Sequence, residues 1–182
     1  MPEPTPSQTI GPFFYDALID ECYASYTNRL VPEATPGITL RGKIQDGAGD
    51  PVPDAMVEIF HAAGDGNHPE AAAPEPHDFA GFGRCATDPN GGYEFHTVRP
   101  GASEGQAPYV QVSVFARGLL KRLVTRIYLP ENEPENAGDP VLNLVPEAAR
   151  GRLVATRDGE EGYRFDVRLQ GEAQTPFFDF ER

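Results

Sequence analysis

The eight residues YVQVSVFA, at positions 109–116, alternate apolar side chains with polar or aromatic ones. Val110, Val112 and Val114 share one face of an extended segment with this period-two pattern. The segment is therefore predicted to be a β-strand that turns its valines toward a core. The opposite face carries Tyr109, Gln111, Ser113 and Phe115.

The same alternation recurs in six other short segments, and turn-forming residues separate them. In the first segment Ile38, Leu40 and Ile44 share a face. DPNGG at 88–92 is predicted to be a hairpin turn, because Asn-Gly tolerates positive φ angles. Short, turn-separated strands predict a mostly β fold: an antiparallel β-sandwich of about seven or eight strands, with an open barrel as the alternative. The six further segments are 38–44, 55–62, 92–98, 122–129, 152–157 and 163–170.

The alternation begins only at residue 38, and this sets the expected domain boundary. Residues 1–37, with prolines spaced along their first part, are predicted to form an extended N-terminal arm, and residues 38–182 one β-sandwich domain. Long irregular segments are expected at 62–83 and 130–151, with a helical turn at 145–150. Loops of that length in a compact β domain often carry function.

The chain is acidic, with a net charge of −13. It has no surplus of cations for phosphate groups or anionic lipids, so we expect no nucleic-acid and no membrane partner. The N-terminus lacks the basic and apolar regions of a signal peptide, and no apolar run approaches the ~20 residues of a transmembrane helix. Together with two widely separated cysteines, Cys22 and Cys85, this favours a cytoplasmic location. Both thiols are expected to be small core residues.

The sequence holds no nucleophile motif such as G-x-S-x-G and no phosphate-binding glycine loop. Three of its four histidines, His61, His68 and His77, lie in or beside one long loop. They could supply the converging donors that a metal needs, or they could be polar residues of a solvated loop, and the pattern favours the second. His96 alternates with aromatic residues and is expected to be a packed or edge histidine.

Four cations gather within ten residues of this acidic chain: Arg117, Lys121, Arg122 and Arg126. They could protect an apolar strand from edge-to-edge pairing. Alternatively they could focus positive charge on an anion, since an acidic protein otherwise repels one. Arginine suits a planar carboxylate because its fork donates two parallel hydrogen bonds.

Five segments of the sequence are distinctive when taken together: TPSQTIGPFF near the start, GRCATDPNGGYEFHTVRPG (83–101), VSVFARGLLKRLVTRIYL (112–129), PVLNLV (140–145) and YRFDVRLQGEAQTPFFDF (163–180). Through them the sequence resembles the intradiol ring-cleavage dioxygenases nearly end to end, in the same order and spacing. This resemblance implies a β-sandwich that takes part in the cleavage of 3,4-dihydroxybenzoate by O₂ to 3-carboxy-cis,cis-muconate, in the beta-ketoadipate pathway of aromatic catabolism.

Catalytic chains of this family bind Fe(III) through two tyrosines and two histidines. The positions that match here are His68, Ser103, Tyr109 and Gln111, and none keeps the expected ligand type. The resemblance therefore implies a vacated metal site in this chain, no catalytic residue of its own, and Fe(III) bound by a homologous partner, the beta chain.

In such two-chain members the substrate cleft lies between the chains. The resemblance assigns contacts with the aromatic substrate to Arg117, as the partner of its carboxylate, and to the arm residues Thr9, Gly11 and Pro12. Phe13 stands where the family commonly has tyrosine, so a hydroxyl contact is expected to be absent there.

Two other functions stay open. The chain could be a purely structural assembly subunit, because its aromatic arm and the tail TPFFDF (175–180) suit burial in an interface, although that tail could equally dock on its own domain. It could also be a free-standing β-sandwich that binds small aromatic acids.

Overall fold

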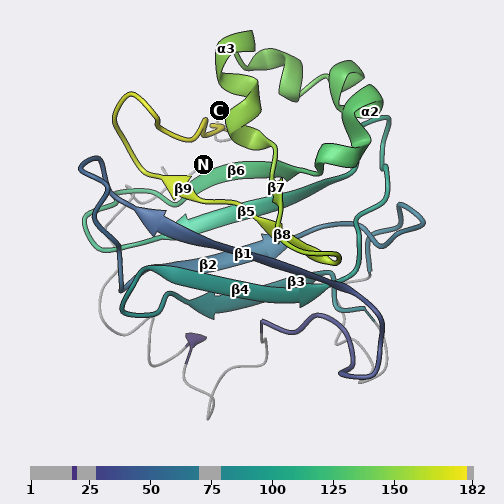
Figure 1. Cartoon of the computed structure of the whole chain (residues 1–182), viewed down its shortest axis with the longest axis horizontal. Helices are drawn as coiled ribbons and strands as arrows, with labels where there is room; N and C mark the ends of the chain where they lie inside the picture. Colours follow the sequence, from purple (N-terminus) through teal and green to yellow (C-terminus); the bar gives the residue numbers. More distant parts are fainter. Residues whose placement is uncertain (1–17, 20–27, 70–78, 180–182) are drawn as a thin grey trace, which may run out of the picture.

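The computed structural model describes residues 18–19, 28–69 and 79–179. Their strands form two sheets that pack face to face (Figure 1), as predicted for a β-sandwich. One sheet has the order β4-β1-β8-β7, with β9 also paired to β1, and the other has the order β3-β2-β5-β6. The strands are β1 (Ile38–Gln45), β2 (Met56–Phe60), β3 (Phe82–Ala86), β4 (Gly92–Thr97), β5 (Tyr109–Phe115), β6 (Leu123–Tyr128), β7 (Thr156–Arg157), β8 (Gly162–Arg164) and β9 (Val167–Arg168).

The main core lies between the sheets and is built from the inward faces that the alternation predicted. Val110, Val112 and Val114 of β5 are at most 1 % exposed. Ile38 and Leu40 of β1 belong to the same cluster. The period of two therefore fixes which side of each strand faces the core.

The end of the expected arm is part of this folded body. Leu30 is 1 % exposed, and its N–H donates to the carbonyl of His96 in β4 at 2.8 Å. The arm's earlier residues 1–17 and 20–27 lie outside the described residues.

Three details of the sequence prediction are corrected. Strand β3 was not among the predicted strands, and its first two residues fall within the segment 62–83 that was expected to be irregular. The turn at 88–92 is tight, with Asp88 Oδ1 accepting from the N–H of Gly92 at 2.8 Å, but it connects β3 of one sheet to β4 of the other and is not a hairpin. The expected strand 152–157 begins instead as a 3₁₀ helix, Gly151–Leu153, and only its last two residues form β7.

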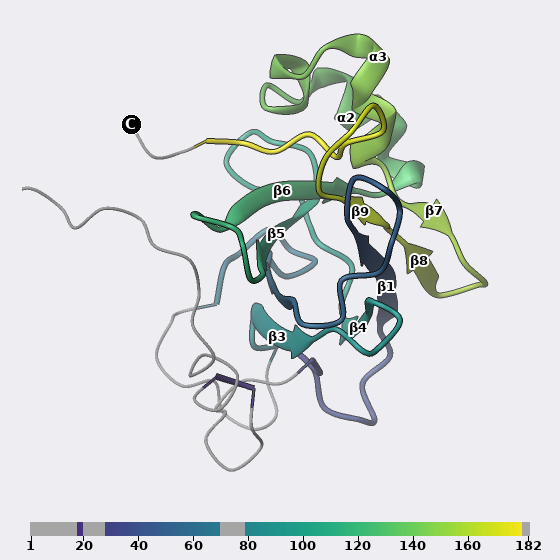
Figure 2. The ribbon, with the colours of Figure 1, turned by 90° about the vertical axis from the view of Figure 1, so that its left-hand side faces the viewer.

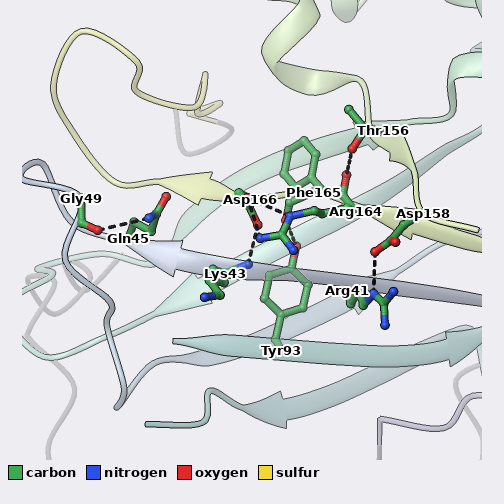
Figure 3. A network of polar contacts seen from close by, with 10 residues as sticks. All are labelled: Arg41, Lys43, Gln45, Gly49, Tyr93, Thr156, Asp158, Arg164, Phe165 and Asp166. Carbon is green, nitrogen blue, oxygen red and sulfur yellow. Dashed lines mark hydrogen bonds and ion pairs between the residues drawn. The ribbon is translucent and has the colours of Figure 1, made fainter. Parts of the chain in front are cut away.

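Strands β8 and β9 join β1 in parallel, whereas the other pairs of strands named here are antiparallel. Polar contacts hold them there (Figure 3). The buried hydroxyl of Tyr93 donates to the carbonyl of Phe165 at 2.6 Å, and the N–H of Lys43 donates to Asp166 Oδ1 at 2.9 Å. Arg41 pairs with Asp158 at the rim.

The segment between β6 and β7 is helical rather than irregular. Its helices gather beyond β6 in both views of the fold (Figures 1 and 2). The turn expected at 145–150 is present as α3. No helix in the described part is long and apolar enough to cross a membrane. The elements are η1 (Pro130–Asn132), α2 (Glu133–Gly138), η2 (Leu142–Leu144), α3 (Glu147–Arg150) and η3 (Gly151–Leu153).

The aromatic tail docks on its own domain as far as it is described. The N–H of Phe178 donates to the carbonyl of Val124 at 2.8 Å, and Thr125 Oγ1 donates to the carbonyl of Pro176 at 2.8 Å. Both contacts lie along β6, the edge strand of its sheet, so the tail covers an edge that could otherwise pair with another chain.

Candidate functional site

Arg117 stands on the loop that joins β5 to β6. Gly118 has a φ of 84°, a left-handed conformation that glycine adopts without strain, and it turns the chain directly after Arg117. The side chain of Arg117 is 77 % exposed, and Leu120 on the same loop is 68 % exposed. The loop therefore presents a cation and an apolar side chain to its surroundings.

The guanidinium of Arg117 is held from one side by Asp54. Its Nε donates to Asp54 Oδ2 in a charge-assisted hydrogen bond. The described residues offer no acceptor to its two Nη groups. Two adjacent N–H donors thus remain open, in the arrangement that matches a carboxylate.

Two of the four positions matched to the family's iron ligands, Tyr109 and Gln111, lie in the first half of β5, away from Arg117. Gln111 is the register partner of Arg126 in β6, and Tyr109 is the register partner of Tyr128. Arg126 is only 5 % exposed, and its guanidinium carbon lies 3.8 Å from the ring centroid of Tyr109. A buried cation therefore sits against this face of β5.

Arg126 also reaches the loop that carries Ser103. Its Nη1 donates to Gln106 Oε1 at 2.6 Å, and the N–H of Gln106 donates to the carbonyl of Ser103 at 2.9 Å. Arg126 thus stacks on Tyr109, pairs in register with Gln111 and reaches the Ser103 turn through Gln106.

His68 is the fourth position, and it is exposed. Its ring stacks on Phe60 at a centroid distance of 5.0 Å. Phe60 is the register partner of Gln111, so His68 lies on the border of the group and not within it.

These residues do not fit a ferric ion. Their donor types are one imidazole, one phenol, one hydroxyl and one amide, and ferric sites of this family need two tyrosinates and two imidazoles. The Arg126 Nε is buried without a hydrogen-bond partner, and no carboxylate among the described residues lies within ion-pair distance of this cation. A trivalent cation placed beside it would be strongly repelled, because the effective dielectric constant is low away from solvent. Within the described ranges no three His, Cys, Asp or Glu side chains form a group that could hold a metal.

Two sequence interpretations are corrected by burial. Arg126 is not an exposed residue that protects a sheet edge, because it is 5 % exposed. His61 is not a solvated loop residue: it is fully buried, its Nδ1–H donates to the carbonyl of Ala62 at 2.8 Å, and its Nε2 accepts from Thr97 Oγ1 at 2.7 Å.

The remaining predicted residues divide as follows. Six of them lie outside the described residues: Thr9, Gly11, Pro12 and Phe13 of the arm, and His77 and Cys22. Cys85 packs against the core as expected, and burial raises the pKa of its thiol to about 12.

Three similarities place the chain among known proteins. A family model described as dioxygenase matches residues 11–171. The chain is 40 % identical to the protocatechuate 3,4-dioxygenase alpha chain of Pseudomonas putida, over 99 % of this chain and 98 % of that one. It is 36 % identical to the protocatechuate 3,4-dioxygenase beta chain of Burkholderia cepacia, over 76 % of this chain and 66 % of that one. The chain therefore belongs to the intradiol dioxygenase family.

Solved structures agree with the fold. The dioxygenase domain of a carbohydrate-binding fusion protein from Streptomyces sp. SirexAA-E is similar with a TM-score of 0.62 at 24 % identity, over 93 % of this chain and 99 % of that one. At this identity the similarity concerns the fold alone.

Proposed function

We propose that this chain is the non-catalytic subunit of a protocatechuate 3,4-dioxygenase and completes the substrate cleft of a homologous beta chain, which binds Fe(III). The complex adds both atoms of O₂ to 3,4-dihydroxybenzoate and opens the ring between its two hydroxyl-bearing carbons. The product is 3-carboxy-cis,cis-muconate. When bound in the beta chain, the ferric ion supplies the chemistry that makes the ring reactive toward O₂.

The observation that carries this proposal is the separation of Arg117 from the vacated metal positions. Tyr109 begins β5, and Arg117 follows two residues after its end. At about 3.3 Å per residue of strand, the eight residue steps from Tyr109 to Arg117 span up to roughly 26 Å of backbone. A single benzene ring with its substituents is much shorter than that distance. The separation therefore supports a metal centre in another chain as the one that holds the ring contacted by Arg117.

In the complex Arg117 orients the substrate. Its two open Nη groups bind the carboxylate of 3,4-dihydroxybenzoate, which directs the two hydroxyl groups at the opposite side of the ring away from this chain. A carboxylate anchor also discriminates against neutral catechol, which would leave the guanidinium without its acceptor. The arm residues Thr9, Gly11, Pro12 and Phe13 are proposed to line the same cleft.

Replacement of Arg117 tests this role. In the co-purified complex, Arg117→Ala should lower kcat/KM for protocatechuate by about 30-fold or more, because loss of a hydrogen-bonded charge partner costs about 2–5 kcal/mol. The low kcat/KM for catechol should stay unchanged. Arg122→Ala removes an exposed cation from the same loop and serves as the charge-matched control. An unchanged kcat/KM for protocatechuate in Arg117→Ala would contradict the role.

The two alternatives predict other outcomes. A purely structural subunit would change assembly in Arg117→Ala while leaving discrimination between protocatechuate and catechol intact. A free-standing binding protein would bind protocatechuate as a lone chain, which equilibrium dialysis detects. The cytoplasmic location stays a prediction from the sequence.

A further inference from the structure

We propose that Asp54 is a positioning residue for the substrate's carboxylate: it holds the Nε edge of Arg117 so that the two Nη groups face the cleft. This inference rests on the proposed function and adds a residue to it. Asp54 lies in the turn before β2, 63 residues from Arg117 along the chain.

The sheet itself brings the two residues together. Strands β2 and β5 are antiparallel, and their pairing ends with Met56 opposite Phe115. Continuing this register by two residues places Asp54 directly opposite Arg117. Cross-strand neighbours of opposite charge attract each other at such positions.

The backbone on the Asp54 side is firmly anchored. Ala55 is 2 % exposed, and its N–H donates to Thr87 Oγ1 at 3.0 Å. Thr87 Oγ1 donates in turn to the carbonyl of Val52 at 2.8 Å. The turn that carries Asp54 is thus fixed to the chain that follows β3.

The Arg117 side is anchored by its own strand and loop. Ala116 is 2 % exposed, and its carbonyl accepts from the N–H of Leu119 at 3.2 Å. The side chain of Arg117 extends beyond these fixed points, with 77 % of it exposed. Asp54 is the single described acceptor for that guanidinium.

Two effects of Asp54 on carboxylate binding oppose each other. By holding Nε, Asp54 restricts a long side chain before the substrate arrives, which removes part of the ordering cost of binding. Its own negative charge repels the incoming carboxylate. The ordering effect dominates in our proposal, because Asp54 contacts the edge of the guanidinium that the substrate does not use and the site is open to screening by water. Loss of Asp54 should therefore raise KM by roughly two- to tenfold, the range for one immobilised side chain.

The test uses the assembled complex with its beta chain and measures kcat and KM for protocatechuate and for catechol. Asp54→Ala removes the contact, whereas Asp54→Asn keeps an acceptor oxygen without the charge and should recover most of the wild-type KM. Asp50→Ala removes a nearby exposed carboxylate with no described side-chain contact and controls for net charge. Size-exclusion chromatography checks that each variant still assembles.

The proposal expects a raised KM for protocatechuate in Asp54→Ala, an unchanged kcat, and unchanged kinetics with catechol. It also expects no further effect of Asp54→Ala when Arg117 is already alanine, because the two residues act as one unit. An unchanged or lowered KM in Asp54→Ala, or an effect that persists in the Arg117→Ala background, overturns it. If Arg117→Ala itself leaves protocatechuate kinetics unchanged, the proposed function fails first, so the two failures are distinguishable.

Discussion

Arg126 stacks on Tyr109, with 3.8 Å between its guanidinium carbon and the ring centroid, across the β5–β6 pair. The contact puts a permanent positive charge against the face of the strand where relatives with iron are expected to hold their ligands. A cation that the chain itself provides thus lies at two of the positions matched to the family's iron ligands, Tyr109 and Gln111.

Two replacements of Arg126 should distinguish how its volume and its charge each affect the free energy of unfolding. Arg126→Ala is expected to lower the free energy of unfolding by about 1–3 kcal/mol, because it leaves a cavity beside Tyr109. Arg126→Met fills most of that space and removes a buried cation that no carboxylate neutralises, so its cost should stay below about 1 kcal/mol or be reversed. Urea unfolding of the lone chain measures both values. Equal losses in the two variants would show that the charge itself stabilises the fold.

His61 should make the stability of the chain depend on pH. Burial lowers the pKa of His61 to about 4 in the folded chain, against 6.5 for a free histidine. Between these values only the unfolded state binds the proton, so the free energy of unfolding is highest above pH 6.5 and falls as the pH drops toward 4. The full effect is about 3 kcal/mol.

Denaturant unfolding between pH 5 and 7 measures this effect, since most carboxylates titrate below that window. His61→Gln should remove most of the slope. His96→Gln, which changes a partly exposed histidine, should keep it. A slope that is the same in wild type and His61→Gln would rule out His61 as its source.

Asp139 is predicted to be a main support of the helical segment beside β6. It is 1 % exposed, and its two oxygens accept from the hydroxyl of Tyr128 and from the N–H groups of Ala107, Val141 and Leu142 at 2.7–2.9 Å. Asp139→Ala strands these buried donors and should cost at least about 3 kcal/mol. Asp139→Asn keeps one acceptor oxygen and should cost less. Thermal unfolding checks both, and a loss below about 1 kcal/mol in Asp139→Ala would contradict this role.

The sandwich could be predicted from sequence because its main strands bury branched side chains at every second residue, as Val110, Val112 and Val114 show. Strand β3 could not be predicted from the sequence, because its inward positions are Gly83, which has no side chain, and Cys85, whose side chain is small. These two residues give no apolar alternation. The turn at 88–92 was recognised from its residues, but which sheets it joins depends on contacts far along the chain.

The candidate site also has residues that could be predicted from the sequence and residues that could not. Arg117 could be found from the family resemblance and from the local concentration of cations. Asp54 and the burial of Arg126 could not, because both follow from strand register: Asp54 faces Arg117 across β2 and β5, and Arg126 faces Gln111 across β5 and β6. Register depends on the whole sheet, and no local pattern in either segment encodes the partner.

The most direct test of the central claim is to measure iron content and ring-cleavage activity for this chain purified alone and co-purified with a homologous beta chain. We expect iron and conversion of protocatechuate only in the co-purified complex, because Arg126 and the donor types at the four matched positions do not fit a ferric ion. Stoichiometric iron together with ring cleavage in the lone chain would contradict the account and would place the metal ligands elsewhere in the sequence.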